Sequence, residues 1–182
     1  MKHKGTVTLA TPRLTLRRFC VEDARAMYVN WASDPDVTMY LTWPTHTDIR
    51  VSRAVIDSWI REYENDAYYQ WAVVLEGQPI GSISVVSENA ETETVQIGYC
   101  IGKHWWHQGI TTEALQAVIR FFFEEVGAKR IEARHDPNNA HSGGVMRKCG
   151  MRYEGTLRQA DRNNQGICDV SWYSILREEY EF

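Results

Sequence analysis

The stretch VQIGYCIGKHWWHQGITTEAL, residues Val95–Leu115, decides the fold. An apolar segment with the character of a β-strand runs into a loop that turns at Gly109, and a helical pattern opens just after it. The first turn of a helix leaves backbone N–H groups unpaired and carries about half a positive charge, so anions bind there. Gly109 allows close approach of a ligand, while Thr111 and Thr112 can cap the helix. The junction therefore predicts a phosphate site, although an ordinary strand-to-helix turn uses the same residue types and no Walker A lysine is present.

The composition is that of an ordinary globular protein. The chain has 182 residues, 43% hydrophobic and 24% charged, and we expect a single domain over residues 1–182. A formal net charge of -4 gives no broad attraction to nucleic acid or to an anionic membrane, so neither is an expected partner. No apolar run reaches the length of a membrane span, and the N-terminal segment lacks the apolar core of a signal peptide. These features predict a cytoplasmic protein.

The cysteines and histidines do not form a metal-binding pattern. The four cysteines are Cys20, Cys100, Cys149 and Cys168. They are widely separated and include no CxxC pair, so we expect reduced thiols in or near the core. His104 and His107 are separated by two tryptophans, and no nearby cysteine or carboxylate completes a ligand set. We therefore expect no metal site.

The first third of the chain reads as a strand followed by two helices. Hydrophobic spacing predicts a strand at Arg13–Phe19 and a helix over Cys20–Ala32. Ser33–Pro35 breaks that helix, and a longer one is expected over Thr47–Tyr63. Aromatic side chains at helical spacing usually belong to a core, so we assign most of them to packing. The less regular Tyr40–Trp43 segment is a candidate wall for a substrate.

The middle of the chain reads as a β-meander and a crossover. Three strands are expected at Tyr69–Leu75, Pro79–Val86 and Thr94–Ile101, with a polar turn over Ser87–Glu93. After the Gly109 loop, a helix over Thr112–Val126 is ended by Gly127, and a strand follows at Lys129–His135. The order strand, helix, strand makes the two strands parallel, with a right-handed connection. The phosphate loop therefore lies at the carboxyl end of a strand.

A further helix is expected over Asn139–Cys149, ended by Gly150. Gly143 and Gly144 each destabilise a helix by about 1 kcal/mol relative to alanine, so either the helix begins late or a ligand passes close to its first turn; we favour the second interpretation. The chain is expected to end in a hairpin and a tail: strands Met151–Gln159 and Ile167–Leu176, the polar loop Asp161–Gly166, and the tail Glu178–Phe182.

Several motifs in a fixed order resemble a known family. TPRLTLRRF at Thr11, QPIGSISV at Gln78, the Gly109 loop, and ARHDPNNAHSGGVMRKCGMRYEG at Ala133 run nearly end to end. Together they resemble the GNAT superfamily of N-acetyltransferases, in particular the RimJ- and RimL-like branch of ribosomal-protein alanine acetyltransferases. The resemblance implies a three-layer α+β fold, whose mixed, mostly antiparallel central sheet splays beside Ile101 at an acetyl-CoA cleft and has helices on both faces. It also implies an acyltransferase that uses acetyl-CoA as co-substrate and no metal.

The superfamily holds the CoA pyrophosphate with a loop of pattern Q/RxxGxG/A, which falls here on Trp106–Thr111. Only Gly109 matches strictly, because Trp106 stands where Gln or Arg is usual and Thr111 where a small residue is usual. The resemblance therefore implies that backbone N–H groups hold the phosphates, with the side-chain contribution left open. The residues implied are His107, Gln108, Gly109, Ile110, Thr111 and Thr112.

The strand before the loop falls where these enzymes pair with the pantetheine arm of the co-substrate, an arrangement similar to β-augmentation by a ligand. The resemblance implies that the backbone N–H groups near Cys100 and Ile101 polarise the thioester carbonyl. Cys100 itself is expected to be a small buried apolar residue rather than a covalent nucleophile, because GNAT enzymes transfer directly and no base is adjacent in sequence.

The NxxS pattern at Asn139 and Ser142 opens the second CoA-facing helix in the RimL-like branch. The resemblance implies that Asn139 hydrogen-bonds the pantetheine arm. Many GNAT enzymes place a tyrosine four positions beyond the serine, and it protonates the departing thiolate. Met146 stands at that position here, so acid catalysis by a tyrosine at this site is excluded. The serine has been given the acid role in this branch, so Ser142 is the candidate acid, with a helix-capping hydroxyl as the alternative. Tyr153 is a further residue that could reach the cleft.

The general base is the least determined part of the sequence pattern. Related enzymes often carry Glu at the position of Gln96, and an amide cannot take a proton. Glu132 resembles a glutamate of the alanine acetyltransferases and is the candidate catalytic base; a solvent-facing strand carboxylate is the alternative. His135 is a further option, since its ordinary pKa of about 6.5 suits proton transfer near neutrality. Because Glu132 and His135 are an odd number of residues apart, they face opposite sides of an unbulged strand, and only one should face the cleft.

The amine acceptor is expected to have a low pKa. An α-amine with a pKa near 8 is about one-tenth neutral at pH 7, whereas a lysine amine near 10.4 is neutral about once in 2,500 molecules. An N-terminal α-amine of a protein or peptide therefore needs far less base. A small-molecule amine, as for antibiotic- or polyamine-acetylating enzymes, and a non-catalytic CoA-binding sensor are the alternatives. The substrate side is expected in the aromatic segment Trp31–Trp59, and a homodimer is left open.

Overall fold

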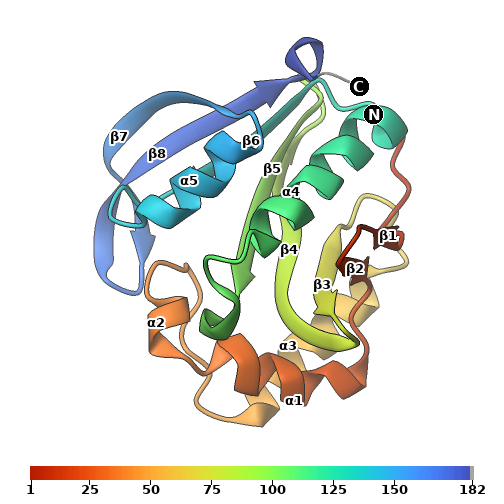
Figure 1. The fold of residues 1–182 in the computed structure, drawn as a ribbon, viewed down its shortest axis with the longest axis vertical. Helices are drawn as coiled ribbons and strands as arrows, with labels where there is room; N and C mark the ends of the chain where they lie inside the picture. The colour runs from red at the N-terminus through yellow and green to blue at the C-terminus, as the bar shows by residue number, and fades with distance from the viewer. Residues whose placement is uncertain (181–182) are drawn as a thin grey trace.

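An eight-stranded sheet in the order β1-β2-β3-β4-β5-β6-β8-β7 organises the computed structural model, which describes residues 1–180 (Figure 1). Neighbouring strands are antiparallel except for the parallel pair β5 and β6. The strands are β1 (Leu9–Ala10), β2 (Leu14–Arg17), β3 (Gln70–Leu75), β4 (Gln78–Asn89), β5 (Thr94–Ile101), β6 (Arg130–His135), β7 (Arg152–Asn163) and β8 (Gly166–Leu176). The expected mixed, mostly antiparallel α+β fold is confirmed.

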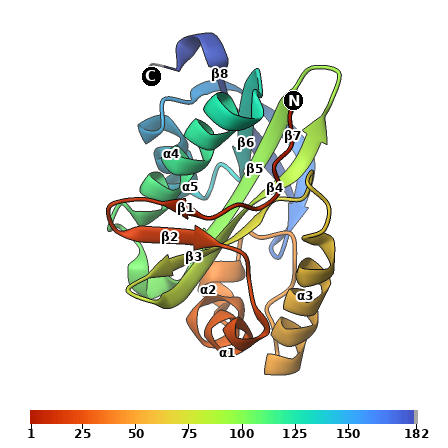
Figure 2. The same ribbon diagram turned by 90° about the vertical axis from the view of Figure 1, so that its right-hand side faces the viewer.

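Helices cover both faces of the sheet. In Figures 1 and 2, α4 and α5 lie on one face and α1 and α3 on the other. The helices are α1 (Ala24–Met27), α2 (Pro35–Thr38), α3 (Ile49–Glu62), α4 (Ile110–Phe121) and α5 (Ala140–Lys148). Wider turns continue α1 over Tyr28–Ala32 and α4 over Phe122–Val126, and single tight turns occupy Val21–Asp23, Lys103–Trp105 and Arg177–Glu179.

Strand β3 shows why the layers form in this way. Its sequence is a continuous apolar run because both of its faces are buried. Successive side chains of a strand point to opposite faces. Trp71 and Val73 accordingly join the core under α4, whereas Ala72 and Val74 join a second core with α1 and α3. One short strand therefore holds the two helical layers together.

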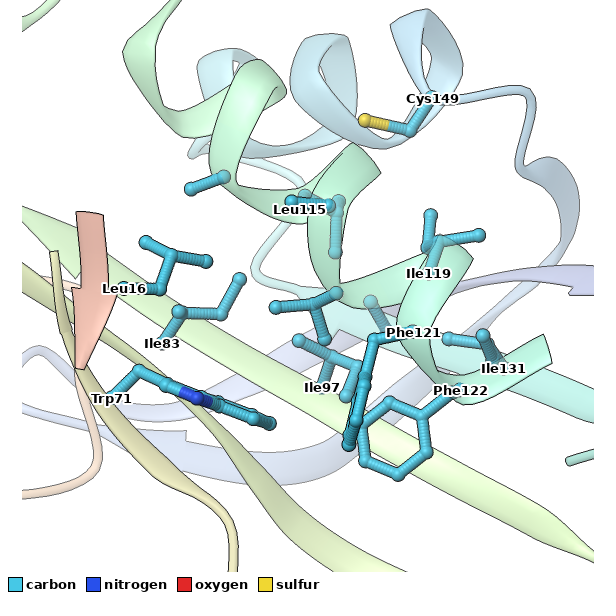
Figure 3. Close-up of a cluster of buried hydrophobic side chains, with 14 of the residues drawn as sticks. Leu16, Trp71, Ile83, Ile97, Leu115, Ile119, Phe121, Phe122, Ile131 and Cys149 are labelled. Atoms are coloured by element: carbon cyan, nitrogen blue, oxygen red, sulfur yellow. The ribbon is translucent and has the colours of Figure 1, made fainter. Parts of the chain in front are cut away.

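The larger core lies between α4 and the sheet (Figure 3). Leu115 and Ile119 of α4 point down onto Ile83 of β4 and Ile97 of β5, and each of these side chains is at most 2% exposed. The aromatic ring of Trp71 meets Phe121 edge-on, with 5.9 Å between ring centroids. This packing fixes the position of α4, and so also the position of the loop that precedes it.

The crossover from β5 through α4 to β6 is parallel, as expected, but its pairing is short. Cα partners in β5 and β6 run only from Thr94 opposite Arg130 to Gln96 opposite Glu132. Strand β5 then continues to Ile101 alongside β4 alone, with Cys100 opposite Ser82. The two strands therefore part beside Tyr99–Ile101, which is the splay expected at this position.

Two strands are longer than the polar sequence suggested. Ser87–Asn89 was expected in a turn but extends β4, because a bulge at Val86 shifts the register and lets this polar segment pair with the start of β5. Asp161–Asn163 was expected in a loop but extends β7. Strand β7 is an edge strand and mostly exposed, so its polar residues are compatible with strand pairing; at its end, the buried Asn163 amide donates to the Asp136 carboxylate at 2.8 Å.

The helix boundaries also need correction. Helix α4 begins at Ile110 rather than Thr112, and its N-cap is Gly109 with φ of 74°; no side-chain cap hydrogen bond is made, so Thr111 and Thr112 lie in the first turn and do not cap it. The short helix α2 was not expected. It follows the cap residue Asp34, whose carboxylate accepts a hydrogen bond from Asp36 N. The end of the expected tail, residues 181 and 182, lies outside the described residues.

The packing of α4 can be tested by truncating a core side chain. We expect Leu115→Ala to lower the free energy of unfolding by about 2–5 kcal/mol, because Leu115 is fully buried and its loss leaves a cavity. Val29→Ala is the matched control, since Val29 is 63% exposed and should change stability by about 0.5 kcal/mol or less. Urea unfolding measures both, and equal effects would contradict the assignment of the core.

Candidate active site

A cleft of about 740 Å³ opens where β5 and β6 part. Its walls are the end of β5, the loop into α4, the first turns of α4 and α5, and α2 with the residues after it. All residues expected to bind acetyl-CoA line this cleft except Gln108: Cys100, Ile101, His107, Gly109, Ile110, Thr111, Thr112, Asn139 and Ser142. Residues that are distant in the sequence thus meet around one cavity.

The loop into α4 has the backbone shape of an anion site. Both His107, with φ of 61°, and Gly109 adopt left-handed conformations. A Cβ at Gly109 would meet no atom closer than 3.6 Å, so glycine is required there by the backbone conformation rather than by crowding. The first intrahelical bond runs from Glu113 N to Gly109 O, so the N–H groups of the first turn lack helical acceptors and face the cleft end of α4.

The loop is held from behind by Arg13. Its guanidinium donates to Gln108 O at 2.9 Å and to the Glu113 carboxylate at 2.6 Å. Thr11 Oγ1 donates to the same carboxylate at 2.6 Å. Burial acts to raise the pKa of Glu113, but these hydrogen bonds outweigh it and hold that pKa below its usual range. The motif TPR near the N-terminus therefore supports the loop.

Trp106 also anchors the loop, which explains the residue that departs from the family pattern. Its indole N–H donates to Ile101 O at 2.9 Å, and its ring packs between the two cores. Gln108 turns away from the cleft, and its amide donates to His104 O at 3.0 Å. Two side chains of the motif thus stabilise the loop.

The α5 side of the cleft carries Asn139 and Ser142. Asn139 is the N-cap residue of α5, yet it makes no side-chain cap hydrogen bond. Ser142 lies inside the helix, and its hydroxyl is 3.2 Å from the hydroxyl of Tyr99, which also donates to Ser142 O at 3.0 Å. Ser142 is therefore not a helix cap, and the capping alternative is wrong.

The two glycines of α5, Gly143 and Gly144, have different surroundings. A Cβ at Gly143 would lie 2.6 Å from His135 Nε2, so this glycine is required by the packed imidazole ring. Gly144 lines the cleft, and a Cβ there would meet only the end of the Arg147 side chain at 4.0 Å. The first turn of α5 lines the cleft, and the expectation that a ligand passes close to this turn stays a prediction.

Tyr99 and Cys100 are partly buried groups of the cleft wall. Burial raises the pKa of Tyr99 despite the hydrogen bond with Ser142, and it raises the pKa of the Cys100 thiol despite contact with the Ser82 hydroxyl at 3.4 Å. A thiol that stays protonated is a poor nucleophile. Sequence reasoning missed the Tyr99 hydroxyl, because only the tertiary structure brings β5 and α5 together.

The candidate general bases lie away from the cleft. Glu132 is not among the lining residues; it lies opposite Gln96 in the sheet and forms an ion pair with Arg130 at 3.1 Å. His135, on the opposite face of β6, donates through Nδ1 to Asp136 O at 2.8 Å, and burial lowers its pKa. It does not line the cleft either, so the expectation that one of the two faces the cleft is wrong.

Met146, which stands at the position of the family's tyrosine, and Tyr153, which was a candidate for reaching the cleft, both lie outside it. Met146 is 1% exposed and belongs to the core. Tyr153 is 56% exposed, and its hydroxyl bonds Thr156 outside the cleft. The segment expected as a substrate wall contributes in part: Tyr40 and Leu41 line the cleft, while Trp43 stacks near the His46 ring.

The α2 end of the cleft adds groups that the sequence did not suggest. Asp36 lines it and is ion-paired with Lys103 from the turn before the loop. On the far wall, the rings of His107 and His141 meet edge-on with centroids 4.6 Å apart. Within residues 1–180, no group of three or more metal-binding side chains is found, and no helix is long and apolar enough to cross a membrane. All four cysteines are free thiols, as expected.

Comparison with known proteins gives the family. The model of the acetyltransferase (GNAT) domain matches residues 13–152. The uncharacterized N-acetyltransferase p20 of Bacillus licheniformis is 33% identical over 176 residues, which cover 95% of this chain and 98% of that protein. The ribosomal-protein-serine acetyltransferase of Escherichia coli is 26% identical over 137 residues, covering 75% of this chain and 76% of that protein.

A solved structure agrees in fold. RimL, a ribosomal L7/L12 alpha-N-protein acetyltransferase in complex with coenzyme A, superposes with a TM-score of 0.84, covering 93% of this chain and 98% of that chain at 20% identity. The resemblance to RimJ- and RimL-like GNAT proteins that the motifs indicated is thereby confirmed. The chain belongs to the GNAT family of acetyltransferases, and it is an N-acetyltransferase.

Proposed function

We propose that this N-acetyltransferase transfers the acetyl group of acetyl-CoA to the α-amine at the N-terminus of a protein or peptide. The observation that carries the choice of acceptor is the absence of a free carboxylate in the cleft. Among the described residues, the only acidic side chain that lines it is Asp36, and Lys103 neutralises that group. A cleft without a strong base favours an acceptor that is already partly neutral.

The pKa of the amine then decides between acceptors. At pH 7 an α-amine is neutral in about one molecule in ten, and a lysine amine in about one in 2,500. An α-amine can therefore attack without a strong general base in the protein. The names of the relatives that acetylate ribosomal proteins agree with a protein acceptor.

For the donor, we assign the phosphates to the loop and the pantetheine arm to the strand. The backbone N–H groups from His107 to Thr112 are the proposed pyrophosphate ligands, because the loop has the left-handed turns and open helix end that anions prefer. The free edge of β5 at Cys100 and Ile101 would pair with the pantetheine amides, and the Asn139 side chain is free of helix capping to join them.

The chemistry needs two kinds of hydrogen-bond donor. Backbone N–H groups near Cys100 and Ile101 would stabilise the negative charge that develops on the thioester oxygen as the amine attacks. The Ser142 hydroxyl would donate to the sulfur as the thiolate departs. Transfer directly from donor to amine, without an enzyme thioester, is the proposed path; in the described part of the chain the Cys100 thiol has no base beside it, and burial raises its pKa, so it is a poor nucleophile.

Gly109→Trp tests the loop. We expect it to abolish acetyl-CoA binding, because an indole at this position would fill the helix end of the cleft. Gly77→Trp is the matched control: Gly77 has φ of 80°, open space around it and no place in the cleft, so it carries the same left-handed strain of about 1–2 kcal/mol. Calorimetry measures both affinities, and unchanged binding in Gly109→Trp would remove the loop from the donor site.

Ser142→Ala tests the hydroxyl on α5. We expect turnover to fall about tenfold or more while affinity for acetyl-CoA stays within about twofold, since the hydroxyl acts on the departing sulfur. Ser58→Ala is the control, because the Ser58 hydroxyl donates to Val55 O on α3, outside the cleft. Steady-state kinetics gives the answer, and normal turnover would exclude Ser142 from the chemistry.

The acceptor is tested with a panel. Release of free thiol from acetyl-CoA is measured with peptides that carry a free α-amine, with the same peptides Nα-blocked but containing lysine, and with small amines such as polyamines. We expect the free α-amine peptides to react fastest. Activity confined to small amines would replace the proposed acceptor class, and tight CoA binding without transfer to any amine would favour the sensor alternative.

A further inference from the structure

Among the side chains of residues 1–180, it is the hydroxyl of Tyr99 that hydrogen-bonds the proposed acid, Ser142. Tyr99 comes from β5 and Ser142 from the first turn of α5, 43 residues further along the chain. The phenolic oxygen lies 3.0 Å from Ser142 O, to which it donates, and 3.2 Å from Ser142 Oγ. Both residues line the cleft, so the contact spans its two walls at the place where the strand and the helix approach each other.

A count of hydrogens shows what this contact does. Tyr99 has one phenolic hydrogen and two acceptors within reach, the carbonyl and the hydroxyl of Ser142. When the phenol donates to the carbonyl, the serine hydrogen is directed at the phenolic oxygen. When the phenol donates to Ser142 Oγ, the serine hydrogen is free to point into the cleft. Tyr99 thus sets the direction of the serine hydrogen.

Without the phenol, a serine in a helix has another partner. Serine hydroxyls inside helices commonly donate to the carbonyl three or four residues earlier, which here is the carbonyl of Asn138 or Asn139. That bond would turn the hydrogen of Ser142 back along the helix. The first turn of α5 is also weakened by Gly143 and Gly144, so the bond from Tyr99 to Ser142 O ties this turn to the strand.

The departing sulfur needs a hydrogen bond rather than a strong acid. Thiols have ordinary pKa values near 8.5, so a thiolate is stable enough near neutrality to leave with a donated hydrogen bond. An alkyl hydroxyl is a far weaker acid than a thiol and keeps its proton. The direction of the serine hydrogen is then the property that matters.

We propose that Tyr99 is a positioning residue for Ser142: when acetyl-CoA is bound, the phenolic hydrogen turns from Ser142 O to Ser142 Oγ, which leaves the serine hydrogen free to point at the thioester sulfur; this inference rests on the function proposed above. A phenol from β5 thereby compensates for the missing tyrosine at Met146 of α5. Because burial raises the pKa of Tyr99, its hydroxyl stays protonated over the working range of pH and remains a donor.

The test is a double-mutant cycle of Tyr99→Phe and Ser142→Ala in the full chain. Tyr99→Phe removes one oxygen, and we expect kcat to fall about tenfold with KM and the calorimetric Kd for CoA within about twofold. The double variant should be no slower than Ser142→Ala alone, because Tyr99 acts through the serine. Tyr153→Phe is the matched control, since it removes the same atom from an exposed tyrosine outside the cleft.

The outcomes separate this inference from the proposed function. If the wild-type protein transfers acetyl groups and Tyr99→Phe retains full turnover, or if the losses of the two single variants multiply in the double variant, the inference is overturned. If the wild-type protein releases no thiol with any amine, the proposed function fails first.

A second replacement covers the case in which Tyr99→Phe does not fold. Incorporation of 2,3-difluorotyrosine at position 99 keeps the ring and hydroxyl but makes the phenol more acidic. A fall of kcat at alkaline pH, absent from the wild-type protein, should then appear, because an ionised phenol cannot donate to Ser142. An unchanged pH profile would contradict the positioning role.

Discussion

The parting of β5 and β6 is the constraint on which the rest of the structure depends. The two parallel strands pair only over Thr94–Gln96, yet β5 continues to Ile101. Backbone groups on the free edge of a strand need partners, and within a fold such an edge is either covered or used by a ligand. Here Trp106 takes the carbonyl of Ile101, and the remaining edge opens on the cleft. The cleft is thus built around an interrupted ladder of strand pairing.

Everything around this gap stabilises its two walls separately. On one side, the packing of α4 against the sheet and the ion pair of Arg13 with Glu113 hold the loop that precedes α4. On the other side, α5 lies against β6, and the His135 ring packs closely on Gly143. The hydroxyl of Tyr99 links the first turn of α5 to β5. Each wall thus has its own support, and the Tyr99 hydroxyl joins the two walls where the strand and the helix approach each other.

The parts predicted well from sequence are those with strong local patterns. The meander and the crossover helix were predicted from the spacing of their apolar residues. The helix ends at Gly127 and Gly150 were predicted from glycine, which adopts a positive φ at both positions. The parts predicted poorly have polar sequences in strands. Ser87–Asn89 pairs with β5 after a bulge in β4, and polar residues are tolerated in β7 because it is an edge strand. Neither the bulge nor the edge position of β7 can be predicted from the sequence before the order of the strands is known.

The sequence by itself determined the family, the glycine turn that opens α4 and the absence of a tyrosine at Met146, because these depend on residue types at short, fixed spacing. Tertiary structure alone decided which polar groups face the cleft. It removed Glu132 and His135 from the cleft wall by pairing one with Arg130 and burying the other against Gly143. It brought Tyr99 to Ser142 across 43 residues. Such contacts depend on how strands and helices are packed, and no local pattern encodes that distance.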